Sequence, residues 1–176
     1  MKTRLTHARL KELLEYDPIT GGFTWRIKRQ GVVSAKKSVA GCLSAHSGRF
    51  YSRICIDGVL YHAHRLAWFY EYGEWPGRID HKSGDGLENA LTNLRPCSQT
   101  ENLANSRRRT DNSSGLKGVT KSRGCASWKA QICINKKNEY IGSYRTKQEA
   151  GRAYDIKALQ YFGSFARTNA SMGLLD

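Results

Sequence analysis

The segment at residues 105–115, NSRRRTDNSSG, most constrains the fold, because apolar residues vanish there and three consecutive arginines precede a Ser/Asn/Gly-rich stretch. This composition is typical of a linker, or of a helix end running into one. We therefore expect two modules rather than one continuous core. The first is placed at residues 1–104, a basic linker at 105–114 and the second module at 115–170.

The positive charge is concentrated late in the chain. Residues 1–106 hold 15 basic and 10 acidic side chains, whereas residues 107–152 hold 12 and 3. This asymmetry indicates a polyanionic partner, and nucleic acid is the default because neutralised phosphates release counterions. The charged N-terminus and the absence of a long apolar stretch predict a cytoplasmic protein with no membrane partner.

The five cysteines form no CxxC pair and leave an odd count. This argues against both a structural zinc site and a disulfide framework. We expect free, buried thiols.

The first module combines a helix with short extended runs. Thr6 is placed to cap a helix that Pro18 ends. The Asp-Gly pair at 57–58 lies between two extended runs and predicts a tight hairpin. The segment HRLAWFYEYGEWP predicts a short aromatic-rich helix that ends at Gly73.

The second module predicts three strands and one helix. The runs GLKGVTK, SWKAQICI and EYIGSY alternate and are joined by turn residues. Thr146 and Glu149 have capping-box spacing, so a helix is expected to follow. Its apolar face is a set of mostly small residues, which favours close packing on a sheet: Ala150, Ala153, Tyr154, Ala158 and Tyr161. The fold class is α+β in both modules.

Residues 79–102 carry the densest set of hard-cation ligands in the chain. Asp80 and His81 stand together at the end of an expected strand. Ser98 and Glu101 have capping-box spacing, which places Asn102 early in a helix. Oxygen atoms of Asp80 and Asn102 suit one Mg²⁺ or Mn²⁺, and the His81 imidazole suits a base near neutral pH.

The first module resembles the HNH endonucleases of bacteriophages. The resemblance runs through LTHARLKELLEYDPITGGFTW, YHAHRLAWFYEYGEWP and IDHxxGDxxxNxxxNLR to NxxNSR. It implies a ββα-metal motif over about residues 61–104, with His81 as general base and Asp80 and Asn102 as metal ligands. Asn93 matches the asparagine that braces the loop. Asn102 stands where many members have His, so the chain resembles the H-N-N subgroup.

Other polar residues of the first module have plainer explanations. His62 and His64 alternate into a helix start and are expected to pack or to form hydrogen bonds. Asp85 and Glu88 are interpreted as loop groups exposed to solvent. The aromatic residues Trp68, Tyr70 and Trp75 are expected in the core or as caps rather than as base-stacking platforms.

The second module resembles the Apetala-two or ethylene-response-factor DNA-binding domain. The matching segments are LKGVTK, WKAQICI, YIGSYRTKQEAGRAYDIKAL and FGSFARTN. The resemblance implies a three-stranded antiparallel sheet backed by one helix, with the sheet in the major groove. It gives these positions as DNA contacts: Lys117, Thr120, Lys121, Ser122, Arg123 and Tyr140.

Strand alternation and the basic run add further candidates for DNA contact. Trp128, Ala130 and Ile132 are expected to face the helix, which points Lys129, Gln131 and Cys133 outward. The run Arg107, Arg108 and Arg109 is expected to contact phosphates without reading bases.

Together these patterns predict a metal-dependent DNA endonuclease of the phage homing type, acting on double-stranded DNA in a bacterial cytoplasm as a monomer or weak dimer. The alternative from another class is a DNA-binding transcription regulator whose first module is only a scaffold. An RNA-binding protein is disfavoured because exposed aromatic runs that stack single-stranded bases are missing.

Overall fold

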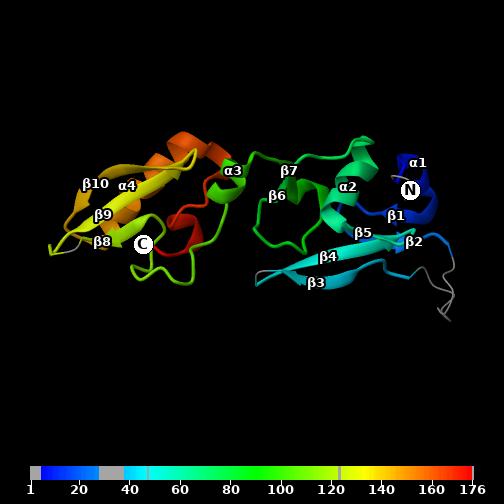
Figure 1. Ribbon diagram of the computed structural model, residues 1–176, viewed down its shortest axis with the longest axis horizontal. Coiled ribbons are helices and arrows are strands. Elements are labelled where there is room, and N and C mark those ends of the chain that lie inside the picture. The colour runs from blue at the N-terminus through cyan, green and yellow to red at the C-terminus, as the bar shows by residue number, and fades with distance from the viewer. Residues whose placement is uncertain (1–4, 28–37, 47, 123, 176) are drawn as a thin grey trace. The chain divides into compact units, whose positions relative to one another are not determined.

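The computed structural model describes residues 5–27, 38–46, 48–122 and 124–175, which Figure 1 shows in colour. The described part is a mixed α/β structure with four α-helices and several small antiparallel sheets. The chain divides into two compact units, residues 1–96 and residues 97–176. The division falls ahead of the basic segment that marks the expected linker.

The first unit contains two α-helices and three small sheets, with pairings β1-β2, β3-β4-β5 and β6-β7, all antiparallel. Its elements in chain order are α1 (His7–Leu13), β1 (Leu14–Tyr16), β2 (Phe23–Trp25), β3 (Cys42–His46), β4 (Arg49–Ile56), β5 (Val59–His62), α2 (Ala63–Tyr72), β6 (Ile79–His81) and β7 (Leu94–Pro96).

The N-terminal helix begins as predicted and ends earlier than predicted. The Thr6 side chain accepts a hydrogen bond from the Arg9 amide, which satisfies one of the first unpaired N–H groups of α1. The helix ends at Leu13 rather than near Pro18, because Leu14–Tyr16 pairs with β2 as a strand. Pairing with a distant segment thus overrides the local helical pattern.

Two glycine-dependent turns position the middle of the unit. Asp57 and Gly58 both have positive φ, 47° and 76°, as a two-residue hairpin turn between β4 and β5 requires. Gly73 ends α2 in the left-handed conformation with φ 72°. Both predictions are confirmed.

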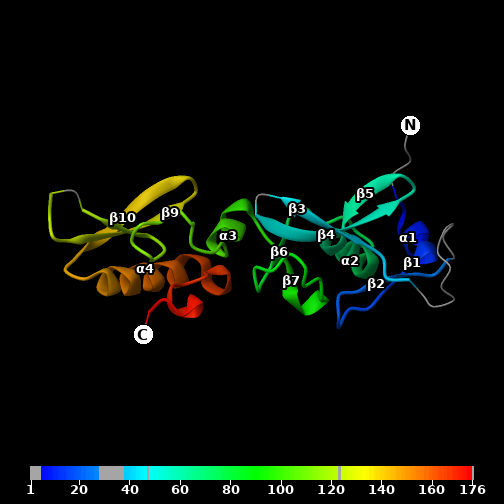
Figure 2. The ribbon, with the colours of Figure 1, turned by 90° about the horizontal axis from the view of Figure 1, so that it is seen from below.

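The core of the first unit lies between the helices and the sheets. α2 packs against β4 and β5, as Figure 2 shows. The largest fully buried side chains here are Leu10, Leu14, Ile54, Ile56 and Leu66. Burial of each contributes roughly 1.5–3 kcal/mol relative to exposure. The expected aromatic residues Trp68, Tyr70 and Trp75 pack against this core, which confirms their structural interpretation.

The second unit is a three-stranded antiparallel sheet with strand order β10-β9-β8, covered on one face by a long helix (Figure 2). This confirms the predicted sheet. The elements are α3 (Gln99–Ala104), β8 (Val119–Lys121), β9 (Trp128–Ile134), β10 (Lys137–Tyr144) and α4 (Lys147–Phe162). Both predicted capping boxes are present, Ser98 with Glu101 at α3 and Thr146 with Glu149 at α4.

One residue of the predicted α4 face is misplaced. Ala150, Tyr154 and Ala158 are buried, whereas Tyr161 is 49% exposed. Residues four apart lie on one helix face, so the row continues to Phe162, which packs against the core in place of Tyr161.

The cysteines are free, as expected, but the expectation that they are buried is wrong. Cys97 is partly buried, and the remaining four are exposed: Cys42, Cys55, Cys125 and Cys133. Strand alternation explains two of them, because Cys55 lies between buried Ile54 and Ile56, and Cys133 has the same setting on β9.

Within the described residues, none of the helices combines the length and the apolar character needed to cross a membrane.

Candidate active site and nucleic-acid surface

The β6-β7 pair fixes Asp80 and His81 in a buried setting. All three residues of β6 are buried, and Asp80 lies directly opposite Arg95 of β7. The Arg95 guanidinium donates two hydrogen bonds to Asp80 Oδ2, from Nη2 at 2.8 Å and from Nε at 3.0 Å. Both side chains are largely shielded from water, so this charge-assisted contact holds the Asp80 carboxylate in one orientation.

The His81 imidazole is 7% exposed and lies next to a second buried polar side chain. Its Nε2 is 3.1 Å from Oδ1 of Asn89. Burial lowers the pKa of His81, against the opposing effects of the Asn89 hydrogen bond and the nearby carboxylates Asp80, Asp85 and Glu88. The imidazole is therefore neutral at neutral pH, the form that accepts a proton.

Asn93 holds the loop between β6 and β7 together. Its Oδ1 accepts a hydrogen bond from the Ser83 amide at 2.9 Å, and its Nδ2 donates to the Glu88 carbonyl at 2.7 Å. Its own carbonyl accepts from the Lys82 amide at 2.9 Å. These bonds tie the residues that follow His81 to the start of β7.

Three histidine rings and one tyrosine ring gather beside β6. The His64 ring centroid is 4.9 Å from that of His81 and 5.2 Å from that of His62, and Tyr51 borders all three rings. Burial lowers the pKa of His64 to about 3, and the charges of His81, His62 and Arg65 add to the effect. His64 Nδ1 is buried and has no hydrogen-bond partner. The sequence predicted packing roles for His62 and His64, but nothing in it indicated their proximity to His81.

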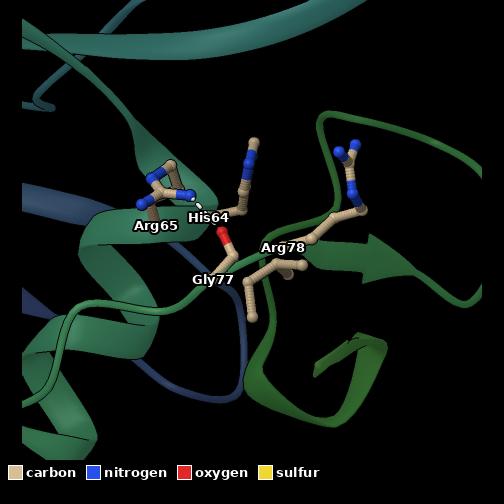
Figure 3. Close-up of a pocket in the computed structure, with 5 residues that line it drawn as sticks. His64, Arg65, Gly77 and Arg78 are labelled. Carbon is tan, nitrogen blue, oxygen red and sulfur yellow. Dashed lines mark hydrogen bonds between the residues drawn. The ribbon is translucent and has the colours of Figure 1, made fainter. Parts of the chain in front are cut away.

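An open pocket of about 430 Å³ lies beside this cluster, lined by His64, Arg65, Gly77, Arg78 and Ile79 (Figure 3). The Arg65 guanidinium donates to the carbonyl oxygens of Gly77 at 2.7 Å and Pro76 at 2.8 Å. Arg65 therefore holds the segment that leads into β6. The side chains of His64 and Arg78 extend from different segments, α2 and the residues before β6.

The two expected metal ligands belong to different units. Asp80 lies on β6 in residues 1–96, and Asn102 lies on α3 in residues 97–176. The donor chemistry, one carboxylate and one amide oxygen, suits a hard cation that takes few protein ligands. Within the part of the chain that the structure describes, no group of three or more His, Cys, Asp or Glu side chains could hold a metal ion.

The C-terminal sheet carries six of the twelve expected DNA contacts. On β9, Ala130, Ile132 and Ile134 are buried while Lys129 and Cys133 are exposed, which confirms the predicted alternation. Tyr140 of β10 lies opposite Gln131 and is 65% exposed. The exposed or partly exposed candidates on this sheet are Thr120, Lys121, Lys129, Gln131, Cys133 and Tyr140.

Three further candidates lie elsewhere. The Lys117 ammonium donates hydrogen bonds to the carbonyl oxygens of Ala104, Ser106 and Arg167. Burial lowers the pKa of Lys117 to about 8. This geometry favours a structural role. Ser122 is buried at 9% exposure, and Arg123 lies outside the described residues.

The arginine run is partly engaged within the chain. Arg109 donates to both carboxylate oxygens of Asp111, at 2.9 and 2.7 Å. Arg108 donates to the carbonyls of Arg109 and Asn112, and Arg107 is exposed. These local bonds, which engage Arg108 and Arg109, could not be predicted from the sequence.

Two comparisons with known proteins agree with different parts of this description. Residues 61–104 match the model of an HNH endonuclease family. This segment begins in β5, includes the β6-β7 pair and ends in α3.

The chain is also similar to plant transcription factors. It is 37% identical over 87 residues to the ethylene-responsive transcription factor WRI1 of Arabidopsis thaliana, which covers 45% of this chain and 20% of that protein. The AP2-like factor AIL6 of the same plant is 37% identical over 62 residues, which cover 34% of this chain and 11% of that protein. The AP2-like factor ANT, also of the same plant, is 28% identical over 100 residues, which cover 53% of this chain and 18% of that protein. The chain therefore spans a fifth or less of these three relatives, and it combines similarity to an HNH endonuclease family with similarity to transcription factors.

Proposed function

We propose that the protein is a metal-dependent DNA endonuclease that hydrolyses phosphodiester bonds, with His81 as the general base. The observation that carries the proposal is the setting of His81 on β6. The ring is buried and neutral, stands next to Asp80 and lies in the segment that matches the HNH endonuclease model. A neutral imidazole beside a carboxylate can take a proton from an attacking water molecule.

The neighbours of His81 support this assignment by restricting its motion. The Arg95 guanidinium orients the Asp80 carboxylate, and Asn93 braces the loop that follows the base. A base held in one geometry loses less entropy on reaching the transition state than a mobile one.

We further propose that Asp80 and Asn102 are the ligands of one Mg²⁺ or Mn²⁺, as the resemblance to HNH endonucleases implies. When bound, a divalent cation supplies positive charge against the negative charge that develops on the phosphate and the leaving oxygen. The oxygen donors of the two side chains are the kind that such ions prefer.

The pocket beside β6 offers cations for the DNA backbone. Arg78 is exposed at its edge, and the Arg65 guanidinium lies at the carbonyls of the same segment. Arginine pairs well with phosphate oxygens because its donors match their geometry. We propose that a phosphate of the bound strand lies against this pocket.

The C-terminal sheet is proposed to supply most of the affinity for duplex DNA. Residues 97–176 hold 14 basic and 6 acidic side chains, and the exposed face of β9 presents Lys129 beside Gln131. Lysine suits phosphate or guanine, and a glutamine amide suits adenine. The other contacts proposed from the sequence include Ser122, Arg123 and the arginine run.

A second function, a DNA-binding regulator without nuclease activity, is favoured by one observation. The relatives matched over about half the chain are named as transcription factors. In such a protein the buried His81 cluster would be a scaffold.

The test is cleavage of plasmid DNA by the purified full chain with Mg²⁺ or Mn²⁺, with and without EDTA. We expect cleavage that EDTA abolishes and that His81→Ala lowers about 10² to 10⁴-fold while DNA binding persists. His64→Gln, which changes the neighbouring ring, tests which histidine is the base: a folded His64→Gln protein that cuts no DNA, together with a His81→Ala protein that cuts at the wild-type rate, would move the base to His64. A protein that binds duplex DNA but cuts none with either cation would be a regulator instead.

We also propose that the protein is an H-N-N subgroup nuclease of phage homing origin that acts in a bacterial cytoplasm as a monomer or weak dimer.

A further inference from the structure

The buried side chain of Asn89 is the partner of the proposed base. Asn89 is 4% exposed and lies within the segment that connects β6 to β7. Its Oδ1 is 3.1 Å from Nε2 of His81. Asn89 has no role in the mechanism proposed for His81.

The orientation of the Asn89 amide is fixed by a second bond. Its Nδ2 donates to the Leu87 carbonyl at 3.1 Å, so the NH₂ group points at an acceptor and Oδ1 points at His81. A carboxamide oxygen only accepts hydrogen bonds. The His81 nitrogen that faces it must therefore carry the proton, which places N–H on Nε2 and the lone pair on Nδ1.

The backbone of Asn89 is itself held by the N-terminal part of the unit. The Tyr16 hydroxyl donates to the Asn89 carbonyl at 2.7 Å, and the Leu91 amide donates to the Pro18 carbonyl at 2.9 Å. Gly21 lies so close that a side-chain carbon there would overlap the backbone of Asn89 and Ala90. The amide thus reaches His81 from a rigid support.

We propose that Asn89 is a positioning residue that selects the tautomer of His81 with the proton on Nε2, so that Nδ1 is the atom that accepts the proton from water. The proposal about Nδ1 rests on the proposed function of His81. The assignment of the tautomer rests only on the Asn89 contacts.

The tautomer can be measured by a method that does not depend on DNA cleavage. In the full chain labelled with ¹⁵N-histidine, the ring nitrogen shifts distinguish Nε2–H from Nδ1–H, and the signals of His81 are those that disappear in His81→Ala. We expect Nε2–H in the wild type and in Asn89→Asp, which keeps an acceptor, and a mixture of tautomers in Asn89→Leu. Nδ1–H in the wild type would overturn the proposal.

Kinetics then test the role of the tautomer in cleavage. Asn89→Leu should lower kcat roughly 10 to 100-fold with little change in KM, as loss of an orienting partner typically does, and Asn89→Asp should recover most of it. In a His81→Ala background, Asn89→Leu should cause no further loss, because the ring it positions is gone. An equal loss in both backgrounds would show that Asn89 acts only on the fold.

Tyr16→Phe is the matched control, because it removes a bond to the Asn89 backbone and leaves Oδ1 in place. It should lower the unfolding temperature and leave the Nε2–H tautomer unchanged. If the wild type has Nε2–H but cuts no DNA, the proposed function is wrong and the tautomer assignment stands. If the wild type cuts DNA while Asn89→Leu keeps both the Nε2–H tautomer and the wild-type kcat, the positioning role is wrong.

Discussion

His64 is a buried imidazole whose surroundings disfavour its protonated form. Its pKa is about 3 in the folded chain, against an ordinary value of 6.5. Between these two values the unfolded chain binds a proton that the folded chain does not. The free energy of unfolding therefore falls as the pH falls below about 6.5, by on the order of 1 kcal/mol per pH unit for one such group.

Chemical denaturation of the full chain at pH 7 and pH 5 checks this expectation for the first unit. The wild type should lose stability at the lower pH, and His64→Gln should lose less because its side chain does not titrate. A part of the dependence should remain in the variant, since burial also lowers the pKa of His81. Identical pH dependence in the two proteins would remove His64 as the cause.

Lys117 and Lys129 are both basic residues of the C-terminal unit, but their surroundings separate their roles. The Lys117 ammonium donates to three carbonyl oxygens, whereas Lys129 is exposed on β9. Lys117→Met should lower the free energy of unfolding by about 1 to 3 kcal/mol, because buried carbonyls lose their donor. Lys129→Ala should leave stability unchanged and weaken duplex binding. It should also reduce the slope of log affinity against log salt by about 1, which corresponds to the loss of one phosphate contact.

Thermal unfolding and gel shifts over a salt series measure both effects. A Lys117→Met protein that is as stable as the wild type but has lost DNA binding would restore Lys117 to the DNA surface.

The sequence could identify Asp80 and His81 because the two lie together on a short strand within a recognisable pattern. It could not identify Arg95 as the partner of Asp80, because that contact depends on the register of β6 with β7. The approach of His64 to His81 likewise depends on how α2 packs beside β6, which residue order does not encode locally. Asn89 was missed for the same reason.

Local sequence signals predicted the secondary-structure elements more reliably than they predicted contacts between distant residues. The capping boxes at α3 and α4 and the Asp-Gly turn at 57–58 each involve residues at most three apart, so they form wherever the chain allows. The end of α1 was predicted wrongly, because it depends on the pairing of β1 with β2, and β2 begins ten residues after the helix ends. The exposed cysteines follow from which strand face meets solvent, a property of the assembled sheets.

The turn between β1 and β2 supports the candidate site through Gly21. This residue has φ 75°, and its backbone lies against Asn89 and Ala90. Gly21→Ala should lower the free energy of unfolding by at least roughly 1–2 kcal/mol, the cost of a left-handed non-glycine residue, and should also displace Asn89.

Gly22→Ala is the neighbouring control, because a side-chain carbon there meets only the Thr20 hydroxyl at 3.3 Å. Denaturation and cleavage assays should show a large loss for the first variant and a small one for the second. Equal effects of the two substitutions would mean that the contact between Gly21 and Asn89 contributes little.

The division of the chain after Pro96 changes what an independent DNA-binding fragment should contain. α3 and the arginine run belong to the same compact unit as the C-terminal sheet. The Lys117 ammonium bonds the carbonyls of Ala104 and Ser106, and the Arg167 amide donates to Ala104. A fragment that begins after the arginine run therefore lacks part of its own core contacts.

We expect the fragment of residues 97–176 to fold alone and to bind duplex DNA with an affinity that falls steeply as salt rises, since its excess charge is +8, from 14 basic and 6 acidic side chains. The fragment of residues 112–176 should unfold at a lower temperature, because two acceptors of Lys117 are removed, and should bind more weakly because Arg107 is gone. Circular dichroism and gel shifts over a salt series compare the two. If the shorter fragment is as stable and binds as tightly, α3 is not part of the DNA-binding unit. If the longer fragment is folded but shifts no DNA at low salt, the C-terminal sheet is not the DNA-binding surface.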